Sequence, residues 1–161
     1  MVTYTDEYIA HLISCPKKIT EAPKKEDSLI SGSYRNMVQL KSKEDLEFSM
    51  FIRRLNALDE LFSIGLIYHP NEGSGQIVVL RCNGPHGDHT NYPAGDEHFT
   101  NHHIHRATQK AIETGLKPER FAEVAQEFAT YDEALAYFVK TANITDADKY
   151  FSIRRQPTLF T

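Results

Sequence analysis

The sequence lacks the features that mark membrane, secreted and disulfide-rich proteins. No stretch approaches the roughly 20 consecutive apolar residues of a membrane-spanning helix. The N-terminus reads M-V-T-Y-T-D-E and has neither the basic start nor the apolar run of a signal peptide. The only cysteines, Cys15 and Cys82, lie far apart and form no C-x-x-C pair, so free thiols are expected. These absences together predict a cytoplasmic protein with no membrane partner.

A strong excess of one charge is also missing. The net charge is −4 with histidine neutral, which argues against a protein that coats nucleic acid without specificity. A local basic groove remains compatible with that balance. The 161 residues suffice for one domain with a hydrophobic core. We therefore expect a single domain over 1–161, in which an N-terminal helix and a basic loop (1–31) precede a sheet (32–107) and C-terminal helices with a tail (108–161).

Hydrophobic periodicity predicts an α+β fold. Apolar residues at helical spacing indicate a short helix over Asp6–Cys15, which Pro16 ends, and the polar stretch 16–28 is expected to be a solvated loop. Alternating or continuous apolar runs predict strands at Tyr34–Lys41, Glu47–Leu55, Leu61–His69, Gln76–Asn83 and His102–Ala107. Helices are expected at 107–114, 118–128 and 131–142. The predicted architecture is an antiparallel sheet of about four to five strands packed against C-terminal helices.

Histidine is concentrated in one short segment. Six of the eight histidines lie within twenty residues, in and just after a Gly- and Pro-rich loop over 84–101: His86, His89, His98, His102, His103 and His105. Histidine acts as general acid, general base or metal ligand near neutral pH. In a strand, His103 and His105 share one face and Ile104 takes the other. This alternation predicts a chemical site, and leaves His102 as a residue that only flanks Ile104.

Acid–base cleavage of RNA is the first chemistry that these residues suggest. Two imidazoles on one strand face can act as base and acid when the attacking hydroxyl belongs to the substrate, so neither a metal nor another cofactor is needed. We expect His103 and His105 in these roles, His86 as a third participant and Arg81 as the phosphate clamp. Arg53, Arg54 and Arg106 are further cations that could reach the same edge.

Zinc is the alternative, because imidazole nitrogens and carboxylates are its usual ligands. His86, His89, His103 and His105 would supply such a set, as part of a zinc-binding or zinc-dependent hydrolase domain. The segment contains no H-E-x-x-H motif, so this hypothesis rests on local abundance alone. A third possibility is a non-enzymatic, phage-type protein that binds a partner protein or forms an oligomer, with which the aromatic residues of the C-terminal tail are compatible.

Three short motifs together resemble a known family. L-R-C-N-G-P-H ends one predicted strand, H-H-I-H forms the next, and E-F-A-T-Y-D-E-A-L-A-Y-F supplies the closing helix. Over about residues 45–144 this order is similar to the TumE-like toxins and small prophage proteins. The resemblance implies a compact α+β fold, toxin-like action on RNA and an antitoxin partner, with Arg81, Asn83, His86, His103 and His105 as matching positions. The chain departs from the pattern at Asn83, where aspartate is frequent, and in its longer loop with the extra His89 and His98.

Overall fold

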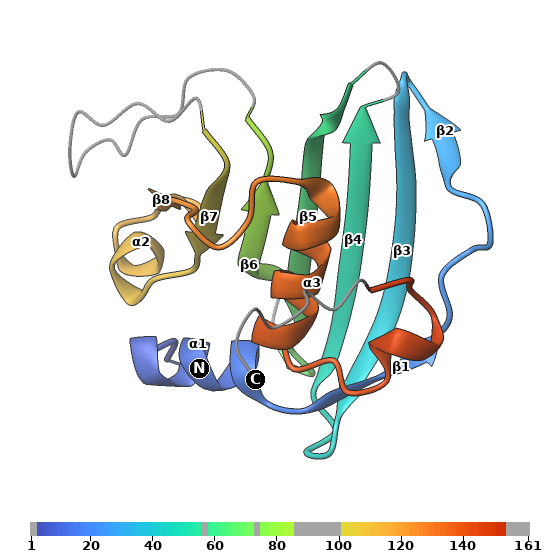
Figure 1. Ribbon diagram of the computed structural model, residues 1–161. Coiled ribbons are helices and arrows are strands. Elements are labelled where there is room, and N and C mark those ends of the chain that lie inside the picture. The colour runs from blue at the N-terminus through green and yellow to red at the C-terminus, as the bar shows by residue number, and fades with distance from the viewer. Residues whose placement is uncertain (1–2, 56–57, 73–74, 86–100, 154–161) are drawn as a thin grey trace, which may run out of the picture.

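One antiparallel sheet carries the fold in the computed structural model, which describes residues 3–55, 58–72, 75–85 and 101–153 (Figure 1). Its eight strands within those ranges are β1 (Lys17–Glu21), β2 (Ser28–Ile30), β3 (Ser33–Ser42), β4 (Glu47–Leu55), β5 (Leu58–His69), β6 (Ile77–Asn83), β7 (His103–Arg106) and β8 (Ala122–Val124). They follow the order β1-β3-β4-β5-β6-β7-β8, and β2 also pairs with β3. The α+β prediction is confirmed, but the expectation of four to five strands is too low.

The long strands form where the sequence alternates. In β4, Phe48, Met50 and Ile52 are buried on one face, and Arg53 is exposed on the other. Each long strand pairs antiparallel with its neighbour in the chain, so alternation in one strand continues into the next, apart from register shifts at Arg54/Leu55 and Leu66/Ile67. One face is therefore mostly apolar and buried over β3, β4 and β5, whereas the other mixes polar side chains with apolar ones such as Phe51 and Met37.

The sequence prediction missed the short strands. β1 lies in the segment expected to be a solvated loop, where Lys17 pairs with Ser42 of β3 and is only 1% exposed. β8 lies where a helix after Pro118 was expected, and Ala122 pairs there with His105. Both predictions are wrong because local composition indicates other structures there: polar and proline residues favour a loop over 16–28, and Pro118 favours the start of a helix. The backbone hydrogen bonds of the adjoining strand decide the conformation instead.

Two helices cover one face of the sheet. α1 (Asp6–Ser14) and α3 (Tyr131–Thr141) begin after the capping residues Thr5 and Thr130, whose side chains accept backbone N–H bonds. Between β7 and β8 lies the short α2 (Gln109–Glu113), and a 3₁₀ turn, η1 (Ala147–Lys149), follows α3. Leu12 of α1 and Phe138 of α3 are fully buried in one core cluster with the sheet. Figure 1 shows α3 lying across this face in front of β5.

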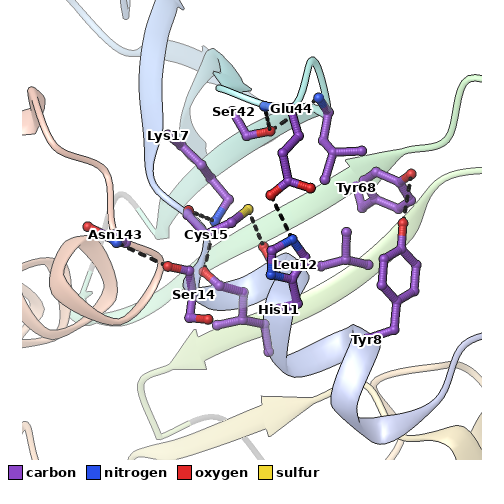
Figure 2. Close-up of polar contacts among 12 residues, drawn as sticks. Tyr8, His11, Leu12, Ser14, Cys15, Lys17, Ser42, Glu44, Tyr68 and Asn143 are labelled. Atoms are coloured by element: carbon purple, nitrogen blue, oxygen red, sulfur yellow. Dashed lines mark hydrogen bonds and ion pairs between the residues drawn. The ribbon is translucent and has the colours of Figure 1, made fainter.

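Lys17 joins the ends of α1 and α3 from inside the core. Its Nζ donates hydrogen bonds of 2.8 to 2.9 Å to the carbonyls of Ile13, Cys15 and Ala142, and lies 4.7 Å from the centre of the Phe48 ring. Figure 2 shows Lys17 beside Cys15 at the end of α1. Three N–H donors thus meet three carbonyl acceptors, all of which lie at the negative, C-terminal ends of α1 and α3. Burial lowers the pKa of Lys17 to about 8.

On the opposite face of the sheet, no described helix covers β3, β4 or β5. The helices contribute their buried apolar residues to the core cluster on the other side. Among the described residues, none of the helices has the length and apolar character needed to cross a lipid bilayer. The uncovered side is called the open face below, and the side that packs against α1 and α3 is the closed face.

Candidate functional site

The register of β6 and β7 brings four of the predicted residues together. Arg81 pairs with His105, and Asn83 pairs with His103. Residues that are paired in neighbouring strands lie on the same face of a sheet, so all four belong to the open face, with Cys82 and Ile104 on the closed face. The two imidazoles share a face, as the alternation predicts, and their ring centres are 5.1 Å apart.

Both imidazoles are buried and held in one orientation. His103 is 0% exposed and His105 is 1% exposed. Nδ1 of His103 lies 2.8 Å from the carbonyl oxygen of Asn101, and Nδ1 of His105 lies 2.8 Å from that of Glu119. Because a carbonyl only accepts, each Nδ1 carries a hydrogen. In the neutral form of each ring, Nε2 therefore carries the lone pair, which is the atom that a base or a metal ligand uses.

A chain of hydrogen bonds runs from β5 to β7. The hydroxyl of Ser63 donates to Oδ1 of Asn83 at 2.6 Å, which turns Nδ2 of Asn83 toward Nε2 of His103 at 3.3 Å. Asn83 is 1% exposed and has a partner on each side. The amide thus connects the imidazole to the rest of the open face.

Arg81 is a cation with few partners. Its guanidinium lies 3.8 Å from the carboxylate of Glu119, and its side chain is 27% exposed. Its Nε is buried and has no hydrogen-bond partner among the residues that the structure describes. Burial lowers the pKa of Arg81, and the charge of Glu119 opposes that shift. A charged group that is partly desolvated and loosely paired favours an anionic ligand.

A hollow of about 430 Å³ opens beside Arg81 on the open face. Arg53, Ser63 and Asn83 share its lining with Arg81 and with three apolar residues, so two guanidinium groups and two hydrogen-bonding side chains meet there beside an apolar wall. Neither His103 nor His105 belongs to the lining. Both lie on β7, the strand next to β6, where His103 is paired with Asn83. The hollow can accept an anion, and Asn83 is its link to the imidazoles.

Two further arginines that the sequence suggested lie on the closed face. Arg54 forms an ion pair with Asp27 at 2.8 Å and stacks on Tyr131. Arg106 bonds to Glu123 and to the hydroxyl of Tyr137. The expectation that Arg54 and Arg106 could serve the site is wrong. Each follows an open-face residue in its strand, so its own side chain points to the closed face.

The remaining histidines separate into two groups. His102 lies on the closed face, with its ring 5.9 Å from those of Phe62 and Phe128, which supports a packing role beside Ile104. His86, His89 and His98 lie outside the described residues. Within the described ranges, no group of three or more His, Cys, Asp or Glu side chains could hold a metal. His103 and His105 alone are half of a tetrahedral set.

Sequence reasoning missed Ser63 and Glu119. Ser63 interrupts the apolar run of β5 between the buried Phe62 and Ile64, a polar alternation that marks the open face. Glu119 is 7% exposed and has no such signal, because it lies in an irregular segment between α2 and β8. Only the folded chain brings its carboxylate to Arg81.

Comparison with known proteins adds no family assignment. No protein-family model, curated protein or solved structure matches this chain. The resemblance to TumE-like toxins therefore stays a prediction that rests on the three sequence motifs.

Proposed function

We propose that this chain binds RNA with one phosphate in the hollow beside Arg81 and cleaves it by acid–base chemistry, as an RNase-type toxin. One observation carries the proposal: Arg53 and Arg81 line the same hollow with Ser63 and Asn83. Guanidinium groups donate paired hydrogen bonds to phosphate oxygens, and stabilise the charge that develops when a phosphate is attacked. Arg81 is the clamp, and Arg53 is the second cation.

The imidazoles supply the proton transfers in this proposal. His103 takes the proton of a ribose 2′-hydroxyl, whose oxygen attacks the adjacent phosphorus. The bond from phosphorus to the 5′-oxygen breaks, and His105, which enters the reaction as the imidazolium with a second proton on Nε2, donates that proton to the leaving oxygen. What supports these roles is the fixed orientation of both rings by the carbonyls of Asn101 and Glu119. To act as base, Nε2 of His103 exchanges the amide of Asn83 for the substrate hydroxyl.

An antitoxin partner protein belongs to the same proposal, because the three sequence motifs resemble toxins that act with such a partner. The zinc hypothesis differs from it in one respect that can be measured. Acid–base cleavage needs no metal, whereas a zinc-dependent hydrolase loses its activity when the metal is removed.

The test is cleavage of a defined RNA by untagged protein with and without a chelator. We expect equal activity in both, and a loss of about 100-fold or more in kcat/KM for Arg81→Gln and for His103→Gln with His105→Gln. Lys140→Gln is the matched control, because Lys140 is exposed on α3 and the substitution removes the same charge. Circular dichroism of each variant verifies that it is folded.

Two results would contradict the proposal. If wild type and the double histidine variant cleave equally, the imidazoles have no catalytic role. If the chelator abolishes cleavage and elemental analysis finds about one zinc per chain, the zinc hypothesis replaces it.

A further inference from the structure

A second hollow lies on the open face, over β3 and β4. Its lining includes Arg35, Met37, Phe51 and Arg53. Because Arg53 also lines the hollow beside Arg81, the two hollows adjoin. The proposed function uses only the first of them, so the second requires its own explanation.

The cations of the second hollow repel one another. Arg35 and Arg53 are directly opposite in the register of β3 and β4. Like charges in this arrangement destabilise a sheet. Nε of Arg35 is buried without a hydrogen-bond partner among the described residues, and Nε of Arg53 has only the hydroxyl of Ser33 at 3.5 Å. A folding role does not account for this pair.

The charge of the hollow is opposite in sign to that of the whole chain. Lys24, Arg35 and Arg53 line it, with Glu21 as the one carboxylate of its described lining. The chain as a whole has a net charge of −4. Positive charge is therefore concentrated where the two hollows adjoin, which is complementary to a polyanion.

A flat aromatic surface lies beside these cations. Phe51 pairs with Gly65 of β5, and its ring lies over that glycine: a Cβ added to Gly65 would be 2.1 Å from ring atom Cε1. Glycine thus allows the ring to lie against the sheet. Met37, paired with Phe51 on the other side, is 47% exposed. Rings held in this way on an open sheet accept stacked nucleic-acid bases.

We infer that the second hollow binds single-stranded RNA, with an unpaired base stacked on Phe51 and a backbone phosphate between Arg35 and Arg53. The strand then continues to the phosphate site at Arg81. The identification of the polymer as RNA rests on the proposed function. Duplex RNA does not fit this role, because its bases are stacked on each other and cannot reach the ring of Phe51.

The test is fluorescence anisotropy with a labelled ten-nucleotide single strand and a duplex of the same sequence. Both probes are 2′-O-methylated, so that they lack the attacking hydroxyl and wild-type protein cannot cleave them by the proposed reaction. We expect Phe51→Leu to weaken single-strand binding by about 5- to 100-fold. Phe121→Leu is the matched control, since Phe121 is also a half-buried phenylalanine but lines a different hollow. Its affinity should match that of wild type.

Two further variants separate the ring from the charges. Gly65→Ala keeps Phe51 but forces its ring to move, so it should weaken binding in the same direction. Arg35→Gln should reduce the slope of log Kd against log salt by about 0.7, the value for one phosphate contact with a single strand. Lys140→Gln should leave the slope unchanged.

The outcomes distinguish this inference from the proposed function. Cleavage with normal single-strand binding by Phe51→Leu overturns the inference and leaves the function standing. Single-strand binding that depends on Phe51, without cleavage of unmodified RNA, supports the inference and refutes the nuclease activity. Equal affinity for duplex and single strand, or no binding to either, overturns the inference. A concentration-dependent dimer that Phe51→Leu abolishes would instead assign the open face to a second copy of the chain.

Discussion

Arg53 and Arg54 are neighbours in β4, yet the fold treats them differently. Arg54 lies on the closed face, where Asp27 pairs with it at 2.8 Å and the Tyr131 ring lies 4.7 Å away. Arg53 lies on the open face, opposite another arginine and beside the hollow that contains Arg81. The closed face thus supplies its cations with acceptors, and Lys17 with its three carbonyls is the clearest case. Cations without such partners are the ones available to a ligand.

The largest expected effect is the loss of Lys17. Lys17→Met keeps the apolar stem but leaves three buried carbonyls without a donor, and each costs about 1 kcal/mol or more. We expect the free energy of unfolding to fall by about 3 kcal/mol, measured by urea denaturation. Lys18→Met on the same strand is exposed and should change it by less than about 0.5 kcal/mol. Equal effects of the two substitutions would show that the hydrogen bonds of Lys17 do not contribute to stability and that only its packing matters.

The pH dependence of stability gives a second, smaller effect. The folded-state pKa of Lys17 is about 8, below the unfolded value of about 10.4, so the unfolded chain binds more protons between those two values. Stability contributed by Lys17 therefore rises as pH increases from 8 toward 10. We expect wild type to gain about 1 kcal/mol per pH unit relative to Lys17→Met in this window. A difference between the two proteins that stays constant with pH would mean that the three carbonyls keep the ammonium protonated throughout.

The smallest effect compares the two neighbouring arginines directly. Arg54→Gln should lower the free energy of unfolding by about 1 kcal/mol, because it breaks the half-buried pair with Asp27. Arg53→Gln should change it by less than about 0.5 kcal/mol, since it also relieves the repulsion from Arg35. A double-mutant cycle with Asp27→Asn measures the coupling to each arginine. Coupling to Arg53 as large as that to Arg54 would remove the distinction between the faces.

Prediction from sequence was accurate where patterns were long. The ten or so residues of β3, β4 and β5 alternate often enough to fix both the strand and its two faces. It failed for β1 and β8, where the pairing strand decides the conformation. At the site, alternation predicted the shared face of His103 and His105, but their complete burial and the position of Glu119 depend on a segment without any periodic pattern.

Residues that lie together on one face of a strand can be identified from their spacing in the chain, because side chains in a strand point alternately to opposite sides. That rule groups His103 with His105 in the sequence, and it also explains why Arg53 and Arg54, which were expected at the same edge, lie on opposite faces. Packing between segments that are distant in the chain determines which face α1 and α3 cover, and therefore which cations have hydrogen-bond acceptors. It also decided that Arg35, Arg53 and Arg81 line adjoining hollows, since the order of strands in the sheet depends on contacts between distant parts of the chain.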